Sequence, residues 1–131
     1  MMQLPDKKPV LIVPAMVSDS NPNGTMFGGW LMGQVDIAAS IPASQQARGL
    51  VVTAGVTSMN FIQPLQVADL VTLYAEISNI GRSSITVDVD VWVQRNCSDP
   101  VVLNVANSRL IFVAVDDLGK PRPLPKPDQN S

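Results

Sequence analysis

Histidine is absent from this 131-residue chain, and its absence removes several kinds of chemistry at once. Ser-His-Asp and Cys-His catalysis, histidine-ligated metals and dehydration by a histidine base all need that side chain. The chain has a single cysteine, Cys97, which cannot form an internal disulfide and lies in a polar stretch without the spacing of a metal site. We therefore expect neither a secreted disulfide scaffold nor a metal site.

Basic residues and long apolar runs are scarce as well. Nine Lys and Arg residues stand against eleven Asp and Glu residues, and no basic run exceeds Lys7-Lys8, so we expect no binding of nucleic acid. The most hydrophobic stretch, Phe27 to Ala43, is interrupted by polar residues and is marginal in length for a bilayer, which argues against stable membrane insertion. Residues Met1 to Pro9 carry prolines and charges where a signal peptide would be apolar, so a cytoplasmic location is expected.

The residues that are present suffice for one folded domain. Hydrophobic residues make up 46% of the chain against 15% charged residues, so burial of apolar surface can offset chain entropy. The length suits a single domain over residues 1–131, but it is short for an enzyme with a cleft of its own. Self-association is therefore expected.

The spacing of apolar residues predicts one long helix and five strands. The helix starts at Phe27, Pro42 is predicted to end or kink it, and a polar link over residues 44–49 follows. Residues 85–93 alternate between apolar and polar side chains, as a half-buried strand requires. The other strands are expected at residues 10–13, 51–61, 68–80 and 101–115, with turns at Gln63-Pro64, Gly81-Arg82 and Cys97-Ser98-Asp99-Pro100.

One helix and a mainly antiparallel sheet indicate an α+β fold. The sheet is expected to curl around the helix, because a single helix offers no other large apolar surface to cover. The segment Gly119 to Ser131 is rich in proline and is predicted to be an extended or flexible C-terminal tail.

Asp36 is the residue of this helix that most needs an explanation. It is the only charged residue between Asp19 and Arg48, inside the most apolar segment of the chain. A desolvated aspartate there would be costly unless it were paired or used, and desolvation would make it more basic. The alternative is an aspartate on a solvent-facing stripe of the helix, and the residues alone leave both interpretations open.

Gly28 and Gly29 stand at the predicted helix start. Glycines there can simply let the loop turn tightly and the helix approach the sheet. In a functional interpretation, their N–H groups lie at the positive end of the helix and offer a site for a developing oxyanion. At 3.6 residues per turn, Gly29, Met32 or Gly33, and Asp36 fall on one helix face. Asn21 and Asn23 are typical turn residues on their own.

Residues 21–36, Asn-Pro-Asn-Gly-Thr-Met-Phe-Gly-Gly-Trp-Leu-Met-Gly-Gln-Val-Asp, resemble the signature of hotdog-fold acyl-CoA thioesterases of the YciA type. The resemblance covers nearly the whole chain through five further segments. These are Val51-Val52-Thr53, Phe61-Ile62-Gln63-Pro64, Gly81-Arg82-Ser83-Ser84, Val113-Ala114-Val115-Asp116 and Gly119-Lys120-Pro121-Arg122-Pro123. Asn60 and Ala54-Gly55 depart from the pattern, since relatives often carry Thr or Asp at the first and a bulkier, often basic pair at the second.

This resemblance implies a sheet wrapped around a central helix and paired across a dimer into one continuous sheet, with dimers assembled as a trimer. It implies that Asp36 activates water or attacks the thioester, while Asn21 comes from the facing subunit and positions water or substrate. An amide near Gly28 or Gly29 would polarise the thioester carbonyl.

The resemblance also implies where acyl-CoA would bind. The segment Gly81-Arg82-Ser83-Ser84 would lie near the CoA phosphates and nucleotide, although on its own such a cluster is more often an ordinary hairpin turn. Asn60 could alter the pocket shape or the contacts with CoA. No cofactor is implied, because coenzyme A is part of the substrate and of the product.

Two other functions are compatible with the same fold. One is an acyl-CoA binding or sensing module without turnover. The other is a hydratase or dehydratase, which ranks last because such enzymes usually rely on the histidine that this chain lacks. The acyl-chain length, the choice between general-base and covalent anhydride mechanisms, and the choice between dimer and hexamer stay open from the sequence alone.

Overall fold

The computed structural model describes residues 3–96 and 98–126, which form one α-helix, a short 3-10 helix and five strands. Cys97 and residues 127–131 of the predicted tail lie outside the described residues. The elements are, in chain order, β1 Leu11–Pro14, the 3-10 helix Val17–Asp19, α1 Gly28–Ala47, β2 Val51–Phe61, β3 Leu70–Ile80, β4 Ser84–Arg95 and β5 Val101–Ala114.

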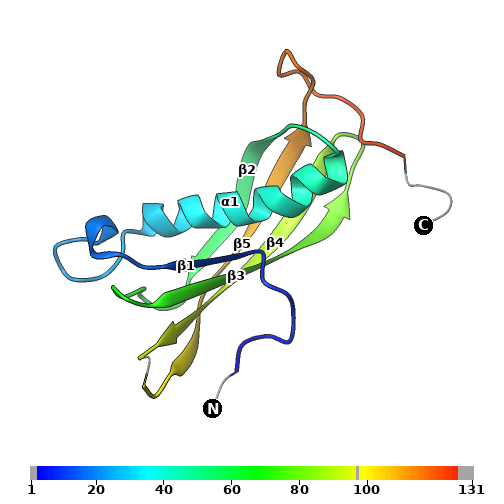
Figure 1. Ribbon diagram of the computed structural model, residues 1–131. Helices are drawn as coiled ribbons and strands as arrows, with labels where there is room; N and C mark the ends of the chain where they lie inside the picture. Colours follow the sequence, from blue (N-terminus) through cyan, green and yellow to red (C-terminus); the bar gives the residue numbers. More distant parts are fainter. Residues whose placement is uncertain (1–2, 97, 127–131) are drawn as a thin grey trace.

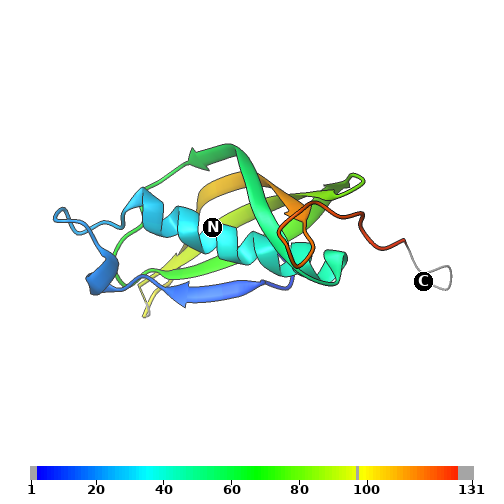
Figure 2. The ribbon, with the colours of Figure 1, turned by 90° about the horizontal axis from the view of Figure 1, so that it is seen from above.

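The five strands form one antiparallel sheet in the order β1-β3-β4-β5-β2. Helix α1 lies along one face of this sheet and packs on β2, β3, β4 and β5 (Figure 1). In Figure 2, which is seen from above, strands flank the helix on both sides. The predicted arrangement, an α+β sheet around one long helix, is therefore what the chain adopts.

The core lies between α1 and the concave side of the sheet. Strand β4 confirms the predicted alternation, since its aliphatic residues are all buried, namely Ile85, Val87, Val89, Val91 and Val93. The helix meets them with a face of mostly small residues, Leu31, Val35, Ala38, Ala39, Ala43 and Ala47. Small side chains let the helix axis approach the sheet closely, which is how a short chain reaches close packing.

Pro42 neither ends the helix nor starts the predicted polar link. Helix α1 continues past it to Ala47, so most of residues 44–49 are helical. The packing of Ala38, Ala43 and Ala47 against the sheet outweighs the missing N–H of the proline. The hydroxyls of Ser40 and Ser44 donate to the carbonyls of Ile37 and Ile41 in this part of the helix.

The predicted turn at Gln63-Pro64 is part of a crossover. Strand β2 pairs with β5, not with β3, so the chain after Phe61 passes beneath the start of α1 to reach the other side of the sheet. The turns between β3 and β4 and between β4 and β5 do join neighbouring antiparallel strands, as predicted. Periodicity identified the strands, but it carries no information about which of them are neighbours.

The described part of the predicted tail, residues 119–126, is extended and hydrogen-bonded to the domain. The N–H of Arg122 donates to the carbonyl of Ala114, and its guanidinium donates to the carbonyls of Val115 and Ala47, at 3.0 and 2.9 Å. Leu124 donates its N–H to the carbonyl of Arg82. These contacts join the tail to the C-terminal end of α1 and to the turn before β4. The predicted flexibility of the tail stays a prediction.

Candidate active site

Asp36 lies on the side of α1 that faces strand β2, where it is half-buried. Its Oδ1 accepts a hydrogen bond from the hydroxyl of Thr53 at 2.6 Å, a short distance typical of an O–H donor on a carboxylate. Thr53 stands immediately before an irregularity in the pairing of β2 with β5, between Thr53 and Gly55. Such bulges re-aim side chains, and here the atypical Ala54-Gly55 pair supplies the bulge beside the carboxylate.

Asp36 and Thr53 line a hollow of about 280 Å³ between α1 and the sheet. The rest of the lining is mostly apolar and consists of Met32, Gly33, Val35, Val56, Met59, Ser108 and Leu110. Gly33 has open space where a Cβ would be, so this face of the helix is not blocked by a side chain. The arrangement places one oriented carboxylate at an apolar surface, which suits an acyl chain with its reactive carbon next to a base.

A second hollow, of about 340 Å³, follows the same line between α1 and β2 at the start of the helix. Gly28 lines it, and a Cβ on Gly28 would lie 3.3 Å from the ring of Phe61, so glycine permits this close approach. Among the described residues none caps the start of α1 with its side chain. The first N–H groups of a helix have no acceptor within it, so those of Gly28 and Gly29 are available to a ligand.

The structure brings only part of the predicted catalytic set together within one subunit. Gly28 and Asp36 are eight residues apart, roughly 12 Å along the helix axis at 1.5 Å per residue. A Cβ on Gly29 would have no atom within 4 Å, and this residue lines neither hollow. Of the residues predicted to share a helix face, Met32, Gly33 and Asp36 line one hollow and Gly29 does not. Gly28 lines the neighbouring hollow.

Asn21 lies in the loop before α1, outside the lining of both hollows. Its Oδ1 accepts the N–H groups of Asn23 and Thr25, and its Nδ2 donates to the hydroxyl of Thr25 at 2.8 Å. The side chain therefore shapes its own turn, as a typical loop asparagine does. In this subunit Asn21 is not placed to assist Asp36, so its predicted role depends on a second subunit.

The predicted CoA-binding residues also lie apart from Asp36. Gly81-Arg82-Ser83-Ser84 forms the turn between β3 and β4, closed by the N–H of Gly81 on the carbonyl of Ser84. Asn60 donates to the Oδ1 of Asn107 across β2 and β5 at 2.8 Å, and Met59 rather than Asn60 lines the Asp36 hollow. Within one subunit these residues and Asp36 do not form a single site.

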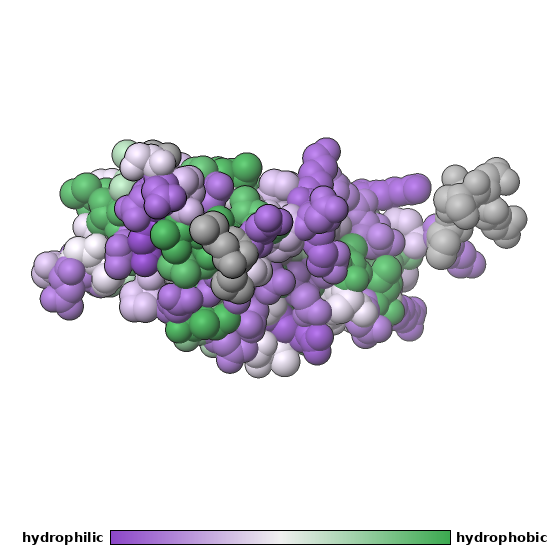
Figure 3. All heavy atoms as spheres, turned by 90° about the horizontal axis from the view of Figure 1, so that it is seen from below, coloured by the Kyte–Doolittle hydropathy of each residue, from purple (hydrophilic) through white to green (hydrophobic). Residues whose placement is uncertain are grey.

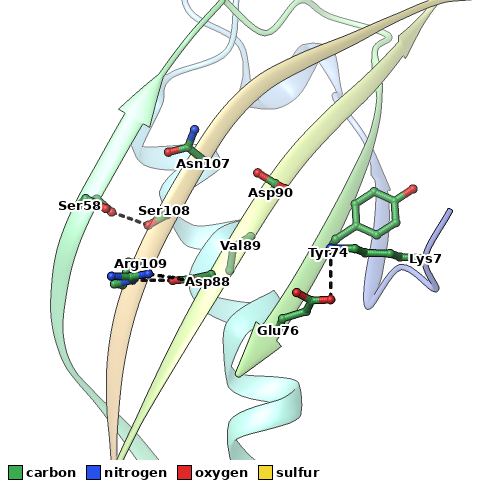
Figure 4. A pocket seen from close by; sticks show the side chains of 10 residues that line it. All are labelled: Lys7, Ser58, Tyr74, Glu76, Asp88, Val89, Asp90, Asn107, Ser108 and Arg109. Atoms are coloured by element: carbon green, nitrogen blue, oxygen red, sulfur yellow. Dashed lines mark hydrogen bonds and ion pairs between the residues drawn. The ribbon is translucent and has the colours of Figure 1, made fainter. Parts of the chain in front are cut away.

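A third hollow, of about 390 Å³, lies on the face of the sheet that is turned away from α1 (Figure 4). Its polar groups are largely paired with one another, Arg109 with Asp88 at 2.7 Å and Lys7 with Glu76 at 3.2 Å. The hydrogen bond from Arg109 holds the pKa of Asp88 below its ordinary value. The face shown in Figure 3 is mainly hydrophilic with separate smaller apolar patches. Paired, exposed ions of this kind are typical of a solvated surface, so we do not place the chemistry there.

The contact of Thr53 with Asp36 is not predicted by any sequence motif. The sequence does offer one indication of Thr53 itself, which carries a hydroxyl, stands in the first strand after the helix and belongs to a segment that matches the family pattern. The spacing of 17 residues across a turn gives no hint that the two side chains meet. Only the packing of α1 on β2 brings them together.

Two absences among the described residues bear on the site. Across residues 3–96 and 98–126, no three His, Cys, Asp or Glu side chains are grouped so that they could hold a metal ion. Over the same residues, no helix has the length and apolar character needed to cross a membrane.

Comparisons with known proteins agree with the geometry. A family model described as the thioesterase superfamily matches residues 23–96. The acyl-CoA thioester hydrolase YciA of Salmonella typhimurium is 44% identical over 123 residues, which cover 92% of this chain and 92% of that protein. The YciA enzyme of Escherichia coli is 43% identical over 118 residues and covers 88% of this chain and 89% of its own.

Solved structures show the same fold. The hexameric thioesterase of Yersinia pestis superposes with a TM-score of 0.87 at 44% identity, covering 95% of this chain and 100% of its own. A hexameric broad-specificity acyl-coenzyme A thioesterase superposes with a TM-score of 0.87 at 41% identity, covering 98% of this chain and 88% of its own. The resemblance read from residues 21–36 is thereby confirmed, and the chain belongs to the thioesterase superfamily, among its hotdog-fold acyl-CoA thioester hydrolases.

Proposed function

We propose that this protein hydrolyses acyl-CoA to a free carboxylic acid and CoA, with Asp36 as the catalytic carboxylate. Its relatives in the family are acyl-CoA thioester hydrolases, so the reaction class follows from membership. The observation that carries the residue assignment is the Asp36 carboxylate, oriented by Thr53 at the wall of an apolar hollow. Among the described residues, no other carboxylate lines that hollow.

In the proposed reaction, a C–O bond to the acyl carbon replaces its C–S bond. Asp36 either takes a proton from water as the water attacks, or attacks the carbonyl itself to give an anhydride that water then opens. In both routes the thiolate of CoA leaves and takes up a proton, so water is the only other reactant. Neither route involves a cofactor or a metal, because Asp36 itself supplies the base or the nucleophile.

The amides at the start of α1 would stabilise the negative charge that develops on the thioester oxygen. Gly28 and Gly29 present N–H groups at the positive end of a helix, and neither carries a side chain that blocks access. Because about 12 Å separate this end from Asp36 on the same helix, we infer that a working site combines elements of two subunits.

Exposed apolar residues support self-association along the line between α1 and β2. Met32 and Ile37 of the helix and Val52, Val56 and Phe61 of the strand are all at least 41% exposed in a single subunit. Strand β2 is also an edge strand, whose free backbone groups can pair with another copy. We propose that β2 pairs across a dimer into one continuous sheet and that three dimers form a hexamer, as in the hexameric relatives.

In this dimer, Asn21 of the facing subunit would position water or substrate beside Asp36. The turn Gly81-Arg82-Ser83-Ser84 would contact the phosphates and nucleotide of CoA, and Asn60 would influence that binding. Arg82 is exposed and its side chain suits a phosphate contact. We place the protein in the cytoplasm, where acyl-CoA is made and used.

Release of the CoA thiol from a panel of acyl-CoA chain lengths tests the proposal. Asp36→Asn should lower kcat by at least about a hundredfold while the subunit still folds, assembles and binds CoA, because the amide has the same shape but no basic oxygen. Ile37→Val, one position along the helix, is the matched control and should retain turnover. Near wild-type turnover of Asp36→Asn would overturn the assignment.

The same assay separates hydrolysis from the main alternative. A binding or sensing module would bind acyl-CoA tightly and release no thiol across the whole panel. The Asp36–Thr53 contact favours the enzyme, because a carboxylate facing an acyl chain would weaken simple binding unless it were used.

A further inference from the structure

Asp69 is the one described carboxylate that the fold buries almost completely, with 1% of the side chain exposed. Arg95 at the end of β4 donates to both of its oxygens, each at 2.9 Å, and also donates to the carbonyl of Pro64 at 3.3 Å. A buried carboxylate held by a two-pronged arginine is a rigid unit, and its formation carries a desolvation cost. Neither residue takes part in the chemistry proposed above.

The arginine and the carboxylate organise the crossover segment between β2 and β3, residues 64–69, which we call the anchor loop. Asp69 accepts the N–H of Gln66 with its side chain and donates its own N–H to the carbonyl of Gln66, at 2.9 and 3.1 Å. Between them, Ala68 has a φ of 74°, a left-handed conformation that a residue with a Cβ adopts only when its surroundings impose it. The anchor loop is thus a tight structure built around Asp69.

The anchor loop holds both ends of residues 15–26, the Asn21 loop. At the first end, Ala15 donates to the carbonyl of Asp69 and accepts the N–H of Ala68, at 2.9 and 2.8 Å. At the second end, Met26 donates to the carbonyl of Leu65 at 2.9 Å, and Thr25 forms a bridge with Gln66. Figure 1 shows this loop projecting beyond the start of α1.

Asn21 itself is tied to the second of these ends. Its backbone N–H donates to the carbonyl of Thr25 at 2.7 Å, and its side chain donates to the hydroxyl of the same residue. Arg95 is therefore linked to Asn21 through the anchor loop: hydrogen bonds join Arg95 to Asp69, Asp69 to Gln66 and Thr25 to Asn21, and Gln66 pairs with Thr25 in a β-bridge.

We propose that Asp69 and Arg95 are positioning residues, which fix the Asn21 loop so that Asn21 reaches the active site of the facing subunit. The proposal rests on the proposed function, because it needs Asn21 to act on the reaction. Its physical basis is that a displacement of about 1 Å can lower a rate by as much as a hundredfold even when the altered residue is remote from the chemistry.

The test is a double-mutant cycle on kcat for acyl-CoA, using the whole assembled protein. Arg95→Lys keeps the charge but loses the two-pronged contact, so it should lower kcat about tenfold with little change in KM. In an Asn21→Ala background the same substitution should change kcat by less than about twofold, because a displaced loop then has no functional side chain to misplace. Arg109→Lys, which alters an exposed arginine–aspartate pair, is the matched control and should leave kcat unchanged.

The result that overturns the proposal is an equal loss of kcat in both backgrounds, or a wild-type kcat for Arg95→Lys. If Arg95→Lys does not assemble, kcat is measured for Asp69→Asn with and without Asn21→Ala instead. If neither variant folds, the pair serves stability alone, and this result also overturns the proposal. The proposed function fails separately if the wild type releases no thiol. A wild-type kcat for Asn21→Ala leaves hydrolysis by Asp36 in place but removes the role of Asn21, and it too overturns the positioning proposal.

Discussion

Replacement of Thr53 by valine tests whether the orientation of Asp36 matters for turnover. Valine keeps the branched shape that suits strand β2 and removes only the hydroxyl, which donates to Oδ1 of Asp36 at 2.6 Å. A hydrogen bond to a charged group contributes about 1.5–3 kcal/mol, which corresponds to roughly 10- to 150-fold in rate if it acts in the transition state. Because the pair is partly exposed, we expect the lower end, a loss of about tenfold in kcat.

The assay is thiol release at saturating acyl-CoA, with KM measured in parallel. Thr53→Ser, which keeps the hydroxyl, is the matched control and should stay within about threefold of the wild type, since only a methyl group is lost. Equal rates for Thr53→Val and the wild type would refute the reasoning, because the shortest contact of Asp36 would then have no part in catalysis.

Two predictions concern stability and are read as urea unfolding midpoints at one fixed subunit concentration. Arg122→Gln loses charged hydrogen bonds to the carbonyl of Val115, just after β5, and to that of Ala47, at the negative end of α1. It should destabilise the protein by about 1–2 kcal/mol, and an unchanged midpoint would contradict the role of the tail. The hydrogen bond from Arg109 lowers the pKa of Asp88 in the folded protein from its ordinary value of 3.8. The pair therefore stabilises the fold fully above pH 3.8, and this contribution is lost as the pH falls through the lower pKa that Asp88 has in the folded protein. The midpoint difference between wild type and Arg109→Gln should therefore be constant from pH 7 to pH 5 and smaller at pH 3; a difference that grows on acidification would contradict this sign.

Much of the fold could be predicted because periodicity is a local property. The alternation over residues 85–93 and the helical spacing after Phe27 each report which side chains face the core, and the structure agrees at these places. The helix does not end at Pro42, because the gain from packing small residues on the sheet is a tertiary effect, while a kink at Pro42 stays a prediction. The crossover at Gln63-Pro64 was missed because strand order depends on contacts between distant segments.

The candidate site was predictable to a different degree for each residue. Asp36 stood out as a lone charge in an apolar helix, and its place at an apolar hollow is consistent with that signal. The partner Thr53 and the buried Asp69–Arg95 pair could not be found, because residues 17 and 26 positions apart meet only through the fold. The role of Asn21 depends on a facing subunit, which no pattern within one chain describes.

The central claim, that Asp36 of one subunit works with Asn21 of its neighbour, is tested most directly by mixing two variants that each have strongly reduced turnover. Asp36→Asn and Asn21→Ala subunits are dissociated, combined in equal amounts and reassembled, and thiol release is compared with each variant alone. Random pairing makes half of the dimers mixed, and each mixed dimer has one intact site out of two, so about a quarter of wild-type activity should return. If the mixture stays as inactive as its components, the two residues do not form a shared site and the account is wrong.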